Sequence, residues 1–299
     1  MRLEVLARVP AKPRLSIGDV LRSGVLPPLD RELILSHVTG LDRAGLYCYW
    51  ERILTQKEQE RFWELAKRRA AGEPLAYLTG QKEFMGLSFY VDRRVLIPRP
   101  ETELLVERAL ELMGPDGVAV DVGTGSGAVA VSLAHYCPGA RVWATDVCSG
   151  ALEVARANAA RHGVAGRVVF LQGDLLDPLK GRLTEGAGVI CANLPYIASE
   201  DMPSLPVQVR LYEPHLALDG GPGGLGHYER LVRQAPAFLK PGGRLLLEIG
   251  YDQARRALAL FGAGWELRVE KDLAGLDRMI EARWKGGEAL DGGAAVAGE

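Results

Sequence analysis

From Gly117 onward, short apolar runs alternate with longer stretches of mixed polarity, and this alternation narrows the possible folds more than any other feature of the sequence. The runs read VAVDVG, RVWATDV, RVVFLQGD, GVICANL and RLLLEIG, and stretches such as SGALEVARANAARHG separate them. Strands that alternate with helices predict an α/β fold with a doubly wound, mostly parallel sheet. Two closing strands, WELRVEKDLAG and an antiparallel DRMIEARW, would bring the sheet to seven strands.

The sequence before this alternation has a helical pattern. Apolar residues recur at helical spacing in 30–43, and the stretch 55–72 opens with Thr55 and Glu58, the signature of a capping box. An N-terminal extension packed on the main fold is the alternative to a separate helical domain. We expect a small all-α domain over 1–73, a β-hairpin linker over 74–100, the α/β domain over 101–285 and a disordered Gly/Ala-rich tail over 286–299.

Composition and charge argue against several kinds of partner. The 299 residues carry a formal net charge of -2, so no strong field draws the chain to nucleic acid or to anionic membranes. No run is long enough to span a bilayer, and the start lacks the apolar core of a signal peptide. The four cysteines form no CxxC pair, and the five histidines show no metal-ligand spacing. We therefore expect a cytoplasmic protein without a metal, a membrane contact or a direct nucleic-acid partner.

A glycine-rich loop follows VAVDVG, the first of the predicted strands, and precedes a predicted helix. It comprises Gly123, Thr124, Gly125, Ser126 and Gly127. Its glycines let the backbone turn sharply and approach a ligand closely, although a tight strand–helix turn without a ligand is the alternative. Dinucleotide sites usually read GxGxxG, and here the last glycine falls one residue early, so a pyrophosphate is less expected.

Acidic residues follow the next two strands. The second strand ends at Asp146, where an acid can bind the ribose hydroxyls of either NAD or S-adenosylmethionine. The third strand is followed by Asp174 and Leu175, which can meet an adenine edge at the same crevice. A solvent-facing Asp174 is the alternative.

The fourth strand ends in Asn193, Leu194, Pro195 and Tyr196, at the edge of the sheet where ligands bind in doubly wound folds. Pro195 biases Leu194 toward an extended backbone, which can aim its carbonyl into the crevice. The Asn193 side-chain oxygen offers a second acceptor. Together they can hold both hydrogens of a planar NH2 group while Tyr196 packs on its flat face. The turn therefore indicates methyl transfer to an amide-like or aniline-like nitrogen, and a strand-ending turn capped by Asn is the alternative.

These motifs resemble the amino-group methyltransferases that carry an (N/D/S)-x-P-(Y/F) turn on the class I methyltransferase fold. The stretch GEPLAYLTGQKEFMGLSFYVDRRVLIPRPETELLVERAL and the later segments DVGTGSGAVAVSLA, ANLPYI and YEPHLALDGGPGGLGHYERLV closely resemble the HemK/PrmC family of release-factor glutamine methyltransferases. The resemblance covers the chain from about Asp30 to Trp284. The usual family turn is NPPY, and Leu194 replaces its first proline here.

The resemblance implies methylation of the glutamine side-chain amide in the GGQ motif of class 1 peptide-chain release factors, with S-adenosylmethionine as cofactor. It implies that the helical domain docks the release factor. It also implies that residues 123 to 127 and Asp146 hold the cofactor, with a contact near Asp174 or Leu175. Asn193 would then touch cofactor and substrate, and Leu194, Pro195 and Tyr196 would frame the glutamine.

Other positions belong to the family signature without a clear chemical role. Arg99, Glu101, Thr102 and Glu103 are expected to fix the linker and the pocket wall. Glu213, Pro214 and the glycines at 220, 221, 223 and 224 are expected to form a loop over the substrate mouth. The competing hypotheses are an amino-group methyltransferase that acts on adenine or cytosine of RNA or DNA or on another protein's glutamine, and a scaffold that has kept the fold without catalysis.

Overall fold

A computed structural model describes residues 14–286 of the chain. The predicted tail lies outside the described residues except for Gly286. The chain divides into two compact units, Met1–Thr79 and Gly80–Glu299. In the part of the chain that the structure describes, no helix is long and apolar enough to cross a membrane.

The first unit is helical, as predicted. Its helices are α1 (Ile17–Arg22), α2 (Pro28–Thr39), α3 (Arg43–Cys48), α4 (Gln56–Ala70) and α5 (Leu75–Thr79). The capping box at the start of α4 is confirmed, because Thr55 accepts from the Glu58 backbone N–H and the Glu58 side chain accepts from the Thr55 N–H. Buried side chains from α1, α2, α3 and α4, among them Ile34 and Phe62, form one apolar core.

The second unit opens with an antiparallel hairpin of β1 (Gln81–Phe84) and β2 (Leu87–Tyr90). A seven-stranded sheet follows in the order β5-β4-β3-β6-β7-β9-β8. Its strands are β3 (Val118–Val122), β4 (Arg141–Asp146), β5 (Val168–Gln172), β6 (Ala187–Ala192), β7 (Leu239–Glu248), β8 (Trp265–Lys271) and β9 (Asp277–Trp284). The first five are parallel and β9 is antiparallel to its neighbours, which confirms the predicted sheet.

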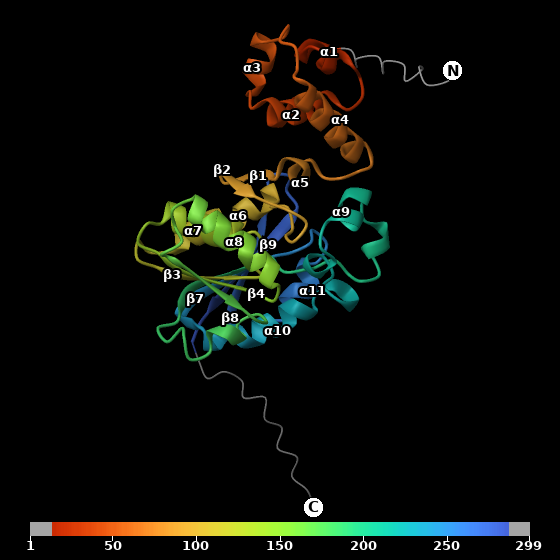
Figure 1. Cartoon of the computed structure of the whole chain (residues 1–299). Helices are drawn as coiled ribbons and strands as arrows, with labels where there is room; N and C mark the ends of the chain where they lie inside the picture. Colours follow the sequence, from red (N-terminus) through yellow and green to blue (C-terminus); the bar gives the residue numbers. More distant parts are fainter. Residues whose placement is uncertain (1–13, 287–299) are drawn as a thin grey trace, which may run out of the picture. The chain divides into compact units, whose positions relative to one another are not determined.

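Helices cover both faces of this sheet (Figure 1). They are α6 (Glu103–Leu112), α7 (Ala128–Tyr136), α8 (Ser149–Arg161), α10 (Gly226–Gln234) and α11 (Ala254–Leu258). A further short helix, α9 (Val207–Tyr212), buries no residue. Short 3-10 turns lie at η1 (Pro100–Thr102), η2 (Asp177–Leu179), η3 (Met202–Ser204), η4 (His215–Ala217), η5 (Pro222–Gly224) and η6 (Ala235–Ala237).

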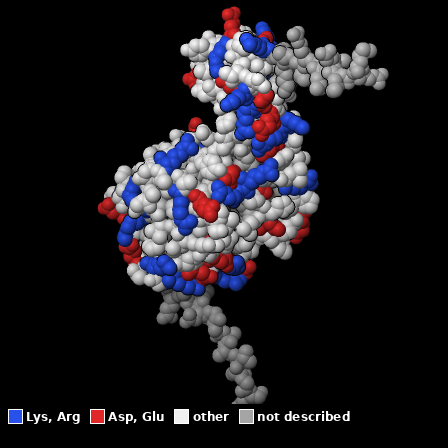
Figure 2. Space-filling model, viewed as in Figure 1, with Lys and Arg blue, Asp and Glu red and all other residues white. Residues whose placement is uncertain are grey.

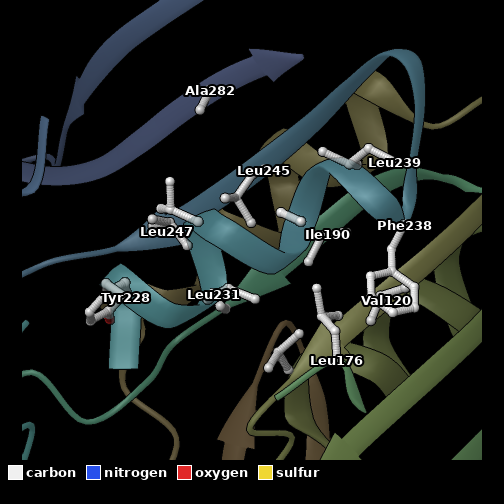
Figure 3. Packing of buried hydrophobic residues seen from close by; sticks show 14 of the residues in the cluster. Val120, Leu176, Ile190, Tyr228, Leu231, Phe238, Leu239, Leu245, Leu247 and Ala282 are labelled. Carbon is white, nitrogen blue, oxygen red and sulfur yellow. The ribbon is translucent and has the colours of Figure 1, made fainter. Parts of the chain in front are cut away.

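Successive residues of the central strands point to opposite faces, which builds two separate cores. Ile190, Leu245 and Leu247 pack with Tyr228 and Leu231 of α10 on one face, as Figure 3 shows. On the other face, Val189 and Leu246 pack with buried residues of α6, α7 and α8. Apolar side chains on both faces explain why these strands read as continuous apolar runs in the sequence.

The strand order reverses between β3 and β6. The chain passes from β3 outward to β4 and β5 and then returns to β6 on the other side of β3. Loops that leave neighbouring carboxyl ends in opposite directions open a crevice, and ligands of doubly wound sheets bind there. The residues that follow β3 and β6 are therefore the first place to examine for a functional site.

Candidate active site

A cavity of about 170 Å³ opens at the carboxyl edge of the sheet. The residues predicted as a site come together here. The lining includes Gly123, Thr124, Gly125, Ser126, Asp146, Asp174, Leu175, Asn193, Leu194 and Pro195. Gly127 and Tyr196 are not among the lining residues. The ligand-binding roles assigned to this whole set from the sequence stay predictions.

The glycine loop needs its glycines for two reasons. Gly123, Gly125 and Gly127 have φ values of 73°, 52° and 80°, in the left-handed region that glycine adopts without cost. A Cβ on Gly123 would lie 2.9 Å from the Leu194 Cδ2, and one on Gly127 would lie 3.0 Å from the Ala155 Cβ. A Cβ on Gly125 would meet nothing within 4 Å, so the backbone there borders open space.

Asp146, the last residue of β4, holds the glycine loop through a hydrogen bond. Its Oδ2 accepts the Gly125 backbone N–H at 2.9 Å, and its Oδ1 accepts the Cys148 N–H at 2.9 Å. Burial raises the pKa of the Asp146 carboxyl, while these backbone hydrogen bonds act to lower it. Each carboxylate oxygen has a second lone pair, so the group can still accept hydroxyls from a ligand in the cavity.

The turn after β5 presents Asp174 and Leu175 to the cavity in different ways. Asp174 forms an ion pair with Arg230, and its side chain is 42% exposed. Leu175 is buried and has a φ of 47°, an uncommon backbone conformation for a residue with a side chain. Leu175 thus supplies an apolar wall, whereas Asp174 lies at the solvent side of the lining.

Asp121 is a buried acid that the sequence prediction did not include in the site. It is 2% exposed, accepts the Thr124 hydroxyl at 2.6 Å and accepts the Ala130 N–H at 3.1 Å. Burial raises its pKa to about 6. Its position inside the apolar run VAVDVG was the available signal, because a charged residue in a fully buried strand requires partners.

The side chain of Asn193 has one hydrogen-bond partner among residues 14–286. Its Nδ2 donates to Thr102 Oγ1 at 3.0 Å. This bond uses the donor end of the amide and leaves Oδ1 as an acceptor. Thr102, for which the sequence predicted only a place in the pocket wall, therefore contacts the central residue of the candidate active site.

The other residues of the turn are held by buried groups on its far side. The Tyr228 hydroxyl lies 3.0 Å from the Leu194 carbonyl oxygen and 2.5 Å from the Glu248 carbonyl oxygen. Gln253 Nε2 donates to the Tyr196 carbonyl at 2.7 Å. Burial raises the pKa of the Tyr196 phenol to about 12, so the ring carries no charge at neutral pH. Neither Tyr228 nor Gln253 was among the residues predicted from the sequence.

The glycines near 220 pack against this turn. A Cβ on Gly220 would lie 2.7 Å from the Pro195 carbonyl oxygen, and one on Gly224 would lie 2.3 Å from that of Tyr196. Only residues without side chains fit at these two positions. These contacts make Gly220 and Gly224 a support for the turn. Pro214 of the same segment lines the cavity, and the loop over the substrate mouth stays a prediction.

A partly buried ion pair holds in place the wall formed by the segment before α6. Arg99 Nη2 donates to Glu213 Oε1 at 2.5 Å, and Glu213 Oε2 accepts the Ile97 backbone N–H at 3.1 Å. Glu103 accepts the Met85 N–H at 2.7 Å and so holds the turn of the hairpin. Arg99 and Thr102 line the cavity, so the wall role expected for this segment agrees with their positions.

Glu248 ends β7 beneath this wall and is only 2% exposed. Among the described residues its Oε2 has no hydrogen-bond partner. Burial raises the pKa of the Glu248 carboxyl to about 7, and a hydrogen bond with the Thr102 side chain acts in the opposite direction. The described residues contain no group of three or more His, Cys, Asp or Glu side chains that could hold a metal ion.

Comparison with known proteins defines the class first. Residues 119–210 match the methyltransferase domain family, and residues 20–80 match the PrmC N-terminal domain family. Among solved structures, a methyltransferase from Pyrococcus furiosus is 20% identical, with 78% of this chain and 100% of that chain covered and a TM-score of 0.48. With its strand order and crevice, the second unit has the class I methyltransferase fold.

Full-length relatives then define the family. A release factor glutamine methyltransferase from Moorella thermoacetica is 47% identical, over 90% of this chain and 94% of the relative. Those from Burkholderia pseudomallei and Bradyrhizobium diazoefficiens are 43% and 42% identical, each over 90% of this chain and over 96% and 93% of their own lengths. The chain belongs to the release factor glutamine methyltransferase family, which confirms the resemblance seen in the sequence.

The raised pKa of Glu248 predicts how stability depends on pH. Between the ordinary value of 4.5 and the folded value of about 7, the folded protein binds more protons than the unfolded chain. The free energy of unfolding therefore contains a contribution that is lost as pH rises through 7. We expect Glu248→Gln to reduce the difference in unfolding free energy between about pH 5 and about pH 9, measured by urea denaturation.

Glu266→Gln is the matched control, because Glu266 is exposed on β8 and pairs with a surface arginine. It should retain the wild-type pH dependence of unfolding. An equal pH dependence in Glu248→Gln would contradict the assigned ionisation.

Proposed function

We propose that this protein transfers a methyl group from S-adenosylmethionine to the side-chain amide nitrogen of the glutamine in the GGQ motif of class 1 release factors. The observation that carries the proposal is the position of Asn193, held by Thr102 at the edge of a cavity that the glycine loop and Asp146 also line. The substrate is inferred from relatives that bear the name release factor glutamine methyltransferase.

The residues of the cavity fit S-adenosylmethionine. The backbone around Gly125 borders open space, and the Asp146 carboxylate retains lone pairs for ribose hydroxyls. Leu175 supplies an apolar surface suited to adenine. When bound, S-adenosylmethionine supplies an electrophilic methyl group on a positively charged sulfur that leaves as a neutral thioether.

The turn after β6 then prepares the nitrogen of the substrate. An amide nitrogen is a poor nucleophile because its lone pair is delocalised into the carbonyl group. Asn193 Oδ1 accepts one of its hydrogens. The Leu194 carbonyl oxygen accepts the other through its second lone pair, because the first faces the Tyr228 hydroxyl. The two bonds fix the orientation of the NH2 group and stabilise the positive charge that develops on nitrogen. Leu194 uses only its backbone here, so its replacement of the usual proline is tolerated. The methylated nitrogen loses its extra proton to water, and no dedicated base is needed.

The first unit is the candidate docking domain for the release factor. Its large exposed apolar side chains are Val25, Leu29, Tyr47, Tyr49, Ile53 and Trp63, and aromatic and aliphatic groups of this kind anchor protein partners. On the face of the second unit seen in Figure 2, basic side chains are interspersed with acidic ones, which suits a protein substrate better than a phosphate backbone. Release factors act on ribosomes, so we place the enzyme in the cytoplasm.

Two substitutions separate cofactor binding from chemistry. Asp146→Ala should weaken S-adenosylmethionine binding by about 10- to 100-fold, because it removes hydrogen bonds to a charged acceptor. Asn193→Ala should change that affinity little and lower kcat by about 100- to 1,000-fold, as the loss of one group that stabilises transition-state charge does. Calorimetry measures the affinity, and transfer of labelled methyl to a release factor measures kcat. Equal turnover in Asn193→Ala would refute the role of its amide.

Docking through the first unit predicts a change in KM that depends on substrate length. Leu29 and Tyr49 are 52% and 58% exposed. Replacing both with alanine should raise KM for the whole release factor by about tenfold, while KM for a short GGQ peptide stays unchanged. Tyr251 and Leu273, exposed on the second unit, give a matched control when replaced together. A rise for factor and peptide alike would mean that the first unit does not dock the factor.

A further inference from the structure

The carboxyl ends of β6 and β7 place two polar residues side by side. The two strands are parallel, and Ala192 pairs with Leu247 in their register. Asn193 and Glu248 are the next residue of each strand, so they are neighbours at the same edge. Ala192 and Leu247 belong to the core that contains α10, and Figure 3 shows Leu247 on that face. Because side chains alternate along a strand, Asn193 and Glu248 turn toward the opposite face, where α6 lies.

Thr102 stands above this pair at the N-cap of α6 and is only 5% exposed. A threonine at an N-cap ordinarily accepts a backbone N–H of the first helical turn. The Thr102 side chain makes no such cap hydrogen bond. Its oxygen instead accepts the Asn193 Nδ2–H at 3.0 Å. A hydrogen bond with the Thr102 side chain also acts to lower the pKa of the neighbouring Glu248 carboxyl.

We propose that Thr102 and Glu248 are positioning residues for Asn193, and that together they hold its amide with Oδ1 available to the substrate. The inference rests on the proposed function, in which Oδ1 accepts a hydrogen of the glutamine NH2 group. It assigns a role to a threonine of the IPRPETE stretch and to the glutamate of RLLLEIG.

The number of hydrogens that Thr102 and Glu248 can donate determines how they orient the Asn193 amide. A carboxylate can only accept, so the single Thr102 hydroxyl hydrogen goes to Glu248. The Thr102 oxygen then has only lone pairs left for Asn193, and it selects the NH2 end of the amide. The reversed amide would set Oδ1 against the Thr102 oxygen with no hydrogen between them. Ionised Glu248 therefore sets the orientation of Asn193 through one intervening hydroxyl.

Protonation of Glu248 removes this selection, because a carboxylic acid can itself donate to the Thr102 oxygen and free the hydroxyl to donate to Asn193 Oδ1. The charged and titratable groups that act on Glu248 or are acted on by it are Arg99, Glu101, Tyr196, Tyr228 and Arg278. The two arginines favour ionised Glu248 and Glu101 opposes it. With burial raising its pKa to about 7, Glu248 changes charge near neutral pH.

Kinetics of full-length variants on a whole release factor test the positioning role. Thr102→Val keeps the shape but removes the hydroxyl, so kcat should fall by about 10- to 100-fold while S-adenosylmethionine affinity stays within about twofold. Thr102→Ser restores the hydroxyl and should recover most of the lost kcat. Wild-type kcat should rise as Glu248 ionises near pH 7, and Glu248→Gln should lower kcat and lose that rise.

Exposed residues provide matched controls. Thr184→Val and Glu266→Gln should leave kcat and its pH profile at wild-type values, because both side chains lie at the surface and outside the cavity lining. Equal kcat in Thr102→Val and wild type would overturn the proposal. So would a serine variant as impaired as the valine variant, or a Glu248→Gln profile that keeps the rise near pH 7.

A spectroscopic measurement tests whether Glu248 and Thr102 orient the Asn193 amide, independently of methyl transfer. In 1H–15N spectra of the wild-type protein, the Asn193 side-chain amide should show one hydrogen-bonded proton whose shift follows the ionisation of Glu248 near pH 7. An Asn193 signal that does not respond to pH would overturn the proposal, even where a variant fails to fold. If the wild type transfers no methyl group to a release factor, the proposed function fails, while this titration still reports whether Glu248 and Thr102 orient the amide.

Discussion

The parallel pairing of β3 with β6 at the centre of the sheet is the constraint on which the rest of the site depends. Val122 pairs with Ala192, so the glycine loop and the Asn193 turn leave adjacent strands at the same edge. The two segments come so close that a Cβ on Gly123 would lie 2.9 Å from the Leu194 side-chain carbon Cδ2. One register thus sets the distance between the predicted cofactor loop and the groups predicted to hold the substrate nitrogen.

Buried polar groups then fix the side chains at this edge, and they have an energetic cost. Asp121 and Glu248 lie almost fully buried beneath the cavity, and burial raises the pKa of each above its ordinary value. A well-packed apolar residue at either position would avoid this desolvation. Their contacts explain why such groups are useful here: Asp121 binds the glycine loop through Thr124, and Glu248 acts on Asn193 through Thr102. The two buried acids lower the stability of the fold and, in return, fix the geometry of the site.

Much of this architecture could be predicted from local sequence, because it depends on patterns within single elements. Alternating apolar runs and helical stretches predicted the doubly wound sheet, and Thr55 with Glu58 predicted the start of α4. The strand-ending positions of Asp146 and Asn193 placed them at one edge, since carboxyl ends of parallel strands converge. The contacts that orient these residues could not be predicted. Thr102 meets Asn193 and Tyr228 meets Leu194 across long sequence separations, and such pairs depend on how elements pack in three dimensions. Sequence reasoning likewise missed that Gly220 and Gly224 support the turn, because only the folded chain brings Pro195 and Tyr196 against them.

Mass spectrometry of a class 1 release factor, incubated with this protein and S-adenosylmethionine, is the most direct test of the proposed methyl transfer. Fragmentation of the GGQ peptide locates any added methyl group to a single residue. We expect one methyl group on the glutamine side chain, and at most a trace of it when Asn193→Ala replaces the wild-type enzyme for the same time. An unmodified glutamine, in a sample where S-adenosylmethionine binding has been measured, would contradict the assigned substrate.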